Sequence, residues 1–188
     1  METLLGLFIG TVIGLFISVV LWWNNFVAKV LDPFLVVLNA LPKTALAPII
    51  IIWVGTGIKG IVCVAVSISL VLTILSSYQY FKNVNEEQIL MLKSFNATKL
   101  QILTNLVIPS NIGNLINLVK INIGMSWVGV IVGEFIVSKE GIGYLIMYGS
   151  QIFKMSLVMM GVLVLSILSF VMYEIVNILE KLWKERRN

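Results

Sequence analysis

The chain alternates long uncharged stretches with short polar ones. Three of the stretches, Leu4–Trp23, Gly60–Phe81 and Met155–Tyr173, run for 20, 22 and 19 residues without a charge. As α-helices they are long enough to cross the roughly 30 Å apolar core of a bilayer. Pro33–Val54 is also apolar, but Pro42 removes a backbone donor from it, so we expect a broken or re-entrant helix there. The pattern predicts five membrane segments: about 4–23, 33–54, 58–81, 111–137 and 155–180.

A polar insert, residues 82–110, separates the third and fourth of these segments. Asn85 is placed to cap a short helix at its start. After a break, Thr98 and Gln101 have the spacing of a capping box and predict a second helix that runs towards Pro109. The insert is either an interfacial linker lying on lipid headgroups or a docking element for another protein.

The composition is that of a membrane protein. Hydrophobic residues make up 59% of the chain and charged residues 12%, and the mean hydropathy is +1.03. A soluble protein of 188 residues has no room in its core for that much apolar surface. We therefore predict an all-α, polytopic helical membrane protein of the plasma membrane, with residues 1–188 forming a single domain.

The lysine and arginine residues predict the orientation. With the C-terminus in the cytoplasm, the outer loops carry Lys59, Lys139 and Lys154. The inner loops then carry a larger basic set: Lys29, Lys82, Lys93, Lys99, Lys181, Lys184, Arg186 and Arg187. This excess follows the positive-inside rule, so the insert is expected to be cytoplasmic and residues 138–154 to face outward. A basic tail after a span is typical of a topology anchor and does not indicate nucleic-acid binding.

Side chains suited to catalysis are scarce. The sequence has no histidine, and its one cysteine, Cys63, lies inside an apolar segment. This excludes disulfide frameworks, thiolate metal clusters and Cys/His nucleophile pairs within the chain. The sequence also lacks the G-x-x-x-x-G-K-[ST] phosphate loop. We expect no enzyme activity in this chain and no bound metal or cofactor.

Small and charged residues inside the predicted spans need separate explanations. Gly6, Gly10 and Gly14 lie on one helix face, a pattern typical of close helix packing. Glu134 lies among apolar residues, where a carboxylate costs about 2.5–3.5 kcal/mol at a helix centre. Three roles stay open for it: reaching the outer interface, bonding to the outer loop, or lining a translocation path. Lys120 is too far along the same helix to pair with it and is expected to reach the inner surface.

Short motifs along nearly the whole chain occur in a consistent order. They are Asp32-Pro33-Phe34, Leu41-Pro42-Lys43-Thr44-Ala45-Leu46-Ala47-Pro48, Trp53-Val54-Gly55, Ile108-Pro109, Ser126-Trp127-Val128-Gly129, Gly133-Glu134 and Gly141-Ile142-Gly143-Tyr144. In this order they resemble the permease subunit of binding-protein-dependent type I ABC importers. The similarity is to the nitrate, sulfonate and taurine branch, which also includes permeases for thiamine precursors and riboflavin.

The resemblance implies that the insert is a coupling loop that docks on a cytoplasmic ATPase. In that family the loop reads Glu-Ala-Ala, then Gly, then an aliphatic-Leu-Pro ending. Here Leu90-Met91-Leu92 replaces Glu-Ala-Ala and Asn96 replaces Gly, and Asn is the least costly replacement where the backbone is left-handed. Within 85–98, the residues expected to contact the ATPase are Glu86, Glu87, Ile89, Leu92, Phe95 and Asn96. Ile89, Leu92 and Phe95 are expected to form an apolar ridge.

A second set of site residues is expected at the outer end. Trp127 and Glu134 would border the translocation path. Gly141 and Gly143 allow a tight turn before a short apolar helix over 144–148. This outer segment is either a plain interfacial loop or part of an outer gate and of the surface on which a solute-binding protein docks.

The resemblance also implies partners. These are a cytoplasmic ABC ATPase dimer that carries the ATP-hydrolysing sites, a second permease copy forming a homodimer, an extracytoplasmic solute-binding protein and membrane lipid. The binding protein would do most of the solute selection. Similar permeases have one more span before the segment that starts at Thr3, so we expect an N-terminal helix to be missing here.

Two other functions are compatible with the spans. A secondary transporter usually has inverted repeats with paired discontinuous helices, and the break at Pro42 has no evident twin in the sequence. A membrane scaffold without transport would leave the Gly133-Glu134 and Gly141-Ile142-Gly143 motifs unexplained.

Overall fold

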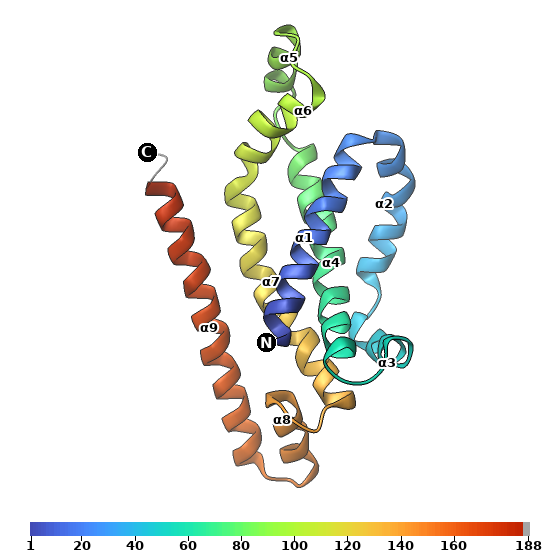
Figure 1. Cartoon of the computed structure of the whole chain (residues 1–188), viewed down its shortest axis with the longest axis vertical. Helices are drawn as coiled ribbons and strands as arrows, with labels where there is room; N and C mark the ends of the chain where they lie inside the picture. Colours follow the sequence, from blue (N-terminus) through green and yellow to red (C-terminus); the bar gives the residue numbers. More distant parts are fainter. Residues whose placement is uncertain (186–188) are drawn as a thin grey trace.

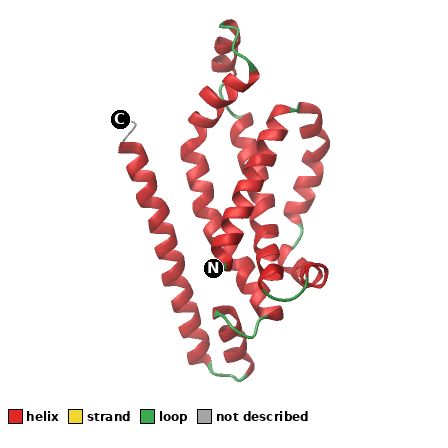
Figure 2. Cartoon of the chain, viewed as in Figure 1, coloured by secondary structure: helices red, strands yellow, loops and turns green. Residues whose placement is uncertain are grey.

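A computed structural model describes residues 1–185, and every regular element in that range is helical (Figure 2). The α-helices are α1 (Glu2–Trp23), α2 (Asn25–Ala40), α3 (Lys43–Val54), α4 (Ile58–Lys82), α5 (Glu86–Ser94), α6 (Lys99–Ile102), α7 (Ile108–Val137), α8 (Ile142–Gln151) and α9 (Met155–Glu185). A π-helical segment, Leu103–Val107, joins α6 to α7. The predicted all-α fold is confirmed. The basic pair Arg186 and Arg187 lies outside the described residues.

The long helices form a bundle whose successive crossings alternate in direction (Figure 1). Within residues 1–185, four stretches are long and apolar enough to cross a membrane: Glu2–Trp23, Ile58–Lys82, Lys99–Val137 and Met155–Leu182. The bent pair α2 and α3 makes a fifth when it is counted as one span. One end of the bundle, here called the insert end, carries α5, α6 and the end of α9, whereas α3 and α8 lie at the opposite end.

Helix α4 packs against α1 through small side chains. A Cβ atom added to Gly6 would lie 2.7 Å from the Cβ of Ala65, and one added to Gly14 would lie 2.6 Å from the Cβ of Thr73. Gly10 packs in the same way against the Ser69 hydroxyl. The predicted packing role of the glycine stripe is confirmed, and the partner helix belongs to the same chain.

A polar contact deep in the bundle joins three helices. The side-chain amide of Asn122 in α7 donates to the hydroxyl oxygens of Thr11 in α1, at 3.0 Å, and of Thr73 in α4, at 2.8 Å. All three side chains are buried. Because apolar packing alone leaves helices free to rotate and slide, directional bonds of this kind fix the register of α1, α4 and α7.

The second membrane segment starts earlier than predicted. Helix α2 begins at Asn25 rather than at Pro33, because the side chain of Asn24 caps it by accepting from the backbone N–H of Phe26 at 3.0 Å. Pro33 therefore lies inside the helix. The predicted break is confirmed, since α2 ends before Pro42 and α3 leaves it at an angle of 99°.

The fourth segment also extends further than predicted. The second helix of the insert runs towards Pro109 as predicted and continues past it, so that one helical stretch extends from Lys99 to Val137. A proline ring inside a regular helix clashes with the carbonyl one turn earlier. Here the wider π-helical segment, Leu103–Val107, precedes Pro109 and gives the ring room. The second half of the insert and the span are consequently parts of one long helix.

Candidate functional site

The first half of the insert is a capped helix, α5, that stands beyond the end of the bundle (Figure 1). The side chain of Asn85 accepts the backbone N–H of Glu87 at 2.8 Å, as the sequence predicts. The capping box is also present: the Thr98 backbone N–H donates to the Gln101 side chain at 2.8 Å, and the Gln101 N–H donates to the Thr98 hydroxyl at 3.3 Å.

Asn96 ends α5 in a left-handed conformation, with φ of 55°. The Asn96 N–H donates to the carbonyl of Lys93 at 2.9 Å, and the Ala97 N–H donates to that of Leu92 at 3.1 Å. These two bonds form a Schellman motif, which requires a residue that tolerates positive φ at this position. The position therefore needs the backbone geometry that glycine supplies in the resembling family, and Asn adopts it.

The apolar side chains of α5 divide between two directions. Ile89 and Leu92 are half-buried and pack against the cluster formed by Phe81, Val84, Ile102, Leu103 and Val107. Phe95, in contrast, is 75% exposed. The predicted ridge of Ile89, Leu92 and Phe95 therefore does not face outward as one surface, because its first two members attach α5 to the bundle.

The outward surface of α5 has a different composition. Leu90, Met91 and Phe95 are all exposed, and they lie on the helix whose first turn carries the exposed carboxylates of Glu86 and Glu87. We call Leu90, Met91 and Phe95 the α5 apolar patch. Sequence reasoning missed Leu90 and Met91, although both fall in the triplet that departs from the Glu-Ala-Ala pattern.

At the opposite end, Glu134 holds the turn that follows α7. Its carboxylate accepts the backbone N–H of Gly143 at 2.6 Å, and the N–H of Tyr144 also faces it. Of the roles left open for Glu134, the hydrogen bond to the outer loop is therefore present. An ionised carboxylate that accepts backbone N–H groups forms stronger bonds than a neutral acceptor does.

The two glycines of this turn are needed for different reasons. Gly141 has φ of 108°, a conformation that side chains disfavour, and it caps the start of α8. Gly143 lies within the first turn of α8, where an added Cβ would be 2.8 Å from the Glu134 carboxylate oxygen. An added Cβ at Gly141 would also meet that carboxylate. The expectation that both glycines shape the turn backbone is thus right for Gly141, which is needed for close approach as well, whereas Gly143 is needed for close approach alone.

Trp127 joins Glu134, Gly141 and Gly143 around one cavity of about 240 Å³. The cavity is also lined by residues of α1 and α9, among them Thr3 and Leu165. The indole N–H of Trp127 is buried and has no hydrogen-bond partner. The structure therefore brings all four predicted outer residues together. A buried N–H group without an acceptor costs folding free energy. A polar solute in the cavity could accept this hydrogen bond, so the unpaired indole is consistent with a place that binds or passes a polar group.

Helix α8 forms the outer boundary of this region. Its rings Tyr144 and Tyr148 stack with centroids 6.0 Å apart. Tyr148 is exposed, whereas Gly149, on the same helix, packs against Leu157 and Val158 of α9. The predicted short helix at this end is confirmed, and it is held on one side by α7 and on the other by α9.

One charged cluster was missed by sequence reasoning. The Lys120 ammonium lies 2.6 Å from a carboxylate oxygen of Glu180 and 3.1 Å from the side-chain oxygen of Asn177. It also lies over the ring of Tyr173. Lys120 therefore pairs with α9 near the end of that helix, and its predicted reach to the inner surface stays a prediction. Tyr173, Asn177 and Glu180 are spaced as one face of a helix, a polar stripe in an apolar span that signals a partner.

The described residues offer little for metal binding. Over residues 1–185, no three side chains of Cys, Asp or Glu come together in the way that metal ligands do. The arrangement instead provides two surfaces at opposite ends, linked by the helical stretch Lys99–Val137.

Comparison with known families gives a match over almost the whole chain. Residues 6–185 match the family described as the binding-protein-dependent transport system inner membrane component. Among similar proteins is the formylaminopyrimidine transport permease protein ThiX of Halalkalibacterium halodurans, 30% identical over 74% of this chain and 56% of its own length.

Two further relatives are similar over a larger share of the chain. The riboflavin transport system permease protein RibX of Chloroflexus aurantiacus is 27% identical over 82% of this chain and 58% of its own length. The taurine transport system permease protein TauC of Escherichia coli is 21% identical over 90% of this chain and 62% of its own length. This chain thus spans 56–62% of the length of the three relatives.

Proposed function

Because this chain belongs to the family of inner membrane components of binding-protein-dependent transport systems, we propose that it is the permease subunit of an ATP-driven importer of a small solute. Residues 1–188 form one permease domain, and 82–110 form its coupling loop. The observation that carries the proposal is the continuous helical stretch Lys99–Val137, which joins the insert at one end to Glu134 at the other. Such an element transmits a displacement over the full depth of the membrane.

The ATPase contact is the α5 apolar patch together with the carboxylates of Glu86 and Glu87. Nucleotide hydrolysis takes place on a separate cytoplasmic ABC ATPase dimer, so force reaches the spans only through a contact between chains. Phe95 is the anchor, because an exposed aromatic ring on a short capped helix fills a cleft at low entropic cost. Ile89 and Leu92 transmit the load from α5 to the cluster at the end of α4 and α7.

The outer gate is the turn held by Glu134. A movement of α7 displaces the Glu134 carboxylate, and with it the backbone of Gly143 and the start of α8. Trp127, on the same cavity, borders the path for the solute. In this proposal the extracytoplasmic solute-binding protein docks on the segment 138–154, where α8 presents Tyr148.

The orientation follows from charge. Lys29 lies in the first half of α2, Lys82 ends α4, Lys93 and Lys99 belong to α5 and α6, and Lys181 and Lys184 lie near the end of α9, all at the insert end. Lys59 lies at the start of α4, and Lys139 and Lys154 flank α8, at the opposite end. The positive-inside rule then assigns the insert end and the C-terminus to the cytoplasm. The transporter contains two permease copies, as a homodimer. Helix α9 is covered little by the other helices of the chain: 11% of its most apolar stretch is buried, against 44% for α4. The exposed surface of α9 supports a homodimer, because a second permease copy can pack against it.

Co-purification with an ATPase tests the proposal. The permease is expressed with a candidate ABC ATPase of the same organism and captured by a tag on the permease. Phe95→Ala should weaken ATPase retention roughly 30-fold, the loss expected for an anchor worth about 2 kcal/mol, and lower uptake with it. Phe26→Ala is the matched control, because Phe26 is 76% exposed at the same end and is not part of the proposed ATPase contact.

The outcomes separate the alternatives. Wild-type retention and uptake in Phe95→Ala would remove the anchor assignment. The same result on deleting 86–98 would overturn the coupling loop itself. Uptake without any ATPase would make the protein a secondary transporter, and a partner bound without uptake would make it a scaffold.

A further inference from the structure

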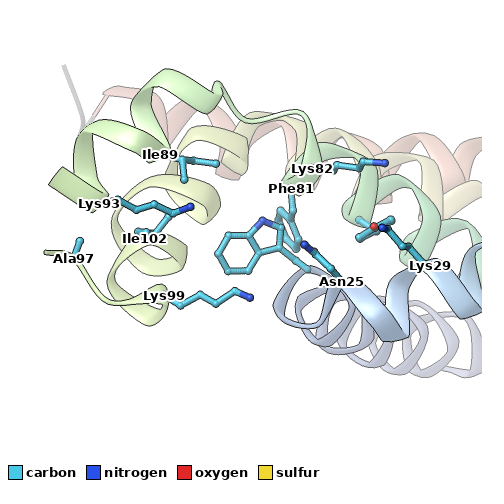
Figure 3. Close-up of a pocket in the computed structure, with 11 residues that line it drawn as sticks. Asn25, Lys29, Phe81, Lys82, Ile89, Lys93, Ala97, Lys99 and Ile102 are labelled. Carbon is cyan, nitrogen blue, oxygen red and sulfur yellow. The ribbon is translucent and has the colours of Figure 1, made fainter. Parts of the chain in front are cut away.

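A cavity of about 550 Å³ lies at the insert end, between the insert and the ends of α1, α2 and α4 (Figure 3). Four lysines line it: Lys29 from α2, Lys82 from α4, Lys93 from α5 and Lys99 from α6. Lys93 and Lys99 extend from the insert towards the opposite wall, on which Asn25 and Lys29 lie (Figure 3). The coupling and gate residues described above do not account for this cluster.

The charge of the cavity is unbalanced. No carboxylate belongs to the lining, and the ion pairs between described residues involve only Lys120, Lys184 and Glu180. Lys99 donates to the backbone carbonyl of Trp23 and lies 5.7 and 5.6 Å from the ring centroids of Trp22 and Trp23. The carbonyl takes one of the three donors of the ammonium, and neither contact supplies a negative charge. Positive groups gathered without counter-charges attract an anion.

The remaining lining is apolar and aromatic. Trp22, Phe81 and Ile102 form part of the wall, and Asn25 adds a side-chain amide. Trp22 and Trp23 close the long apolar helix α1, which is where tryptophans mark the boundary between the acyl chains and the headgroups of a bilayer. The cavity therefore sits at headgroup level, with lysines at its mouth and apolar rings beside them.

We propose that this cavity binds the phosphate headgroup of an anionic phospholipid of phosphatidylglycerol type, with the lysine ammonium groups on the phosphate and the acyl chains along the apolar ends of α1 and α2. Basic pockets between membrane helices suit such headgroups. The hydroxyl-rich glycerol group meets Asn25, which offers both a donor and an acceptor. Exposed Phe26 and Val30 extend the apolar surface along α2 for the chains.

The bound lipid would act on the position of the insert. Lys93 belongs to α5 and Lys99 to α6, whereas Lys29 and Lys82 belong to α2 and α4. A phosphate bound by lysines from both sets ties the insert to the bundle and offsets the mutual repulsion of the lysines. This inference does not depend on an ATPase partner, because lipid binding is measured on the permease itself.

Lipid titration of the full chain tests the proposal. The purified protein is stripped of lipid in a neutral detergent and titrated with phosphatidylglycerol or phosphatidylcholine of identical acyl chains, and bound lipid is counted by native mass spectrometry. We expect one tightly retained phosphatidylglycerol and no matching phosphatidylcholine. Equal retention of both lipids by the wild-type protein would overturn the proposal without any variant.

The lysine variants locate the site. Each lysine near an anionic headgroup contributes a factor of about five, so Lys29→Gln with Lys93→Gln should weaken phosphatidylglycerol binding roughly 30-fold. Lys59→Gln with Lys154→Gln removes the same charge at the opposite end and should leave binding unchanged. Lys29→Arg with Lys93→Arg should retain it. An equal loss in the control pair would show a non-specific charge effect and overturn the site.

Two further experiments identify which kind of anion the cavity binds. Millimolar inorganic phosphate should not displace the lipid, and complete displacement would assign the cavity to free phosphate instead. Phosphatidylglycerol should also stay bound when an ATPase is added. Its release on ATPase binding would assign the lysines to an acidic surface of that partner and overturn the lipid site.

Discussion

The carboxylate of Glu134 accepts the backbone N–H of Gly143 at 2.6 Å, which ties the end of α7 to the start of α8. This contact closes the turn around Gly141 and forms one side of the cavity that Trp127 also lines. The bond is local along the chain but joins two helices whose relative movement would open or close the outer end. Four predictions follow from this and three other contacts.

Glu134→Gln should lower uptake more than it lowers the amount of protein in the membrane. The amide keeps an oxygen acceptor but loses the charge, and hydrogen bonds to a charged group contribute roughly 1.5–3 kcal/mol, more than neutral ones. Uptake per inserted protein is the measurement. Uptake at the wild-type level with normal protein amounts would reject a role for the carboxylate. Gly143→Ala should also lower uptake per inserted protein, because its Cβ would lie 2.8 Å from that carboxylate. Gly113→Ala is the control, because a Cβ at Gly113 has no atom within 4 Å.

Gly10→Ala and Gly124→Ala should change thermal stability in opposite directions. Both glycines lie within helices, so alanine gains up to about 1 kcal/mol in helix propensity at either position. At Gly124 the added Cβ meets nothing within 4 Å, whereas at Gly10 it meets the Ser69 side chain. The midpoint of thermal unfolding should rise for Gly124→Ala and fall for Gly10→Ala. A rise for both would show that α1 and α4 are not in close contact.

Lys120→Met should lower the unfolding midpoint more than Lys184→Met does. Both lysines contact Glu180 at 2.6 Å, but the side chain of Lys184 is 60% exposed and that of Lys120 only 11%. A sheltered pair is screened less by water and salt than an exposed one. Thermal unfolding in one detergent provides the comparison. Equal effects of the two substitutions would mean that the link between α7 and α9 does not depend on Lys120.

Asn96→Gly should preserve or slightly raise stability, whereas Asn96→Val should lower it. Glycine adopts the left-handed conformation at φ of 55° freely, whereas a β-branched residue pays roughly 1–2 kcal/mol there. Proteolysis of the insert in native membranes reports its local order. Asn96→Val should be cleaved faster between α5 and α6, and identical cleavage rates would show that the Schellman motif is not maintained in the membrane.

The helix ends of the insert were predictable from sequence because they depend on contacts between near neighbours. Asn85 caps the residue two positions on, and Thr98 and Gln101 bond across three. The break at Pro42 and the turn at Gly141 are equally local, since both result from backbone restrictions of single residues. The apolar stretches determined the number of spans for a similar reason, because a bilayer fixes the length that each helix must have.

Only the tertiary structure decided which polar groups meet. Lys120 and Glu180 are 60 residues apart, and nothing in their local sequences shows that α7 and α9 lie side by side at that depth. The same holds for Lys29 and Lys93, which line one cavity from α2 and α5. Ile89 and Leu92 face inward only because α5 packs against the end of α4, α6 and the π-helical segment. Local sequence sets where a helix starts and stops. The face that a helix buries depends instead on the helices packed against it, and the fold of the whole chain brings those helices together.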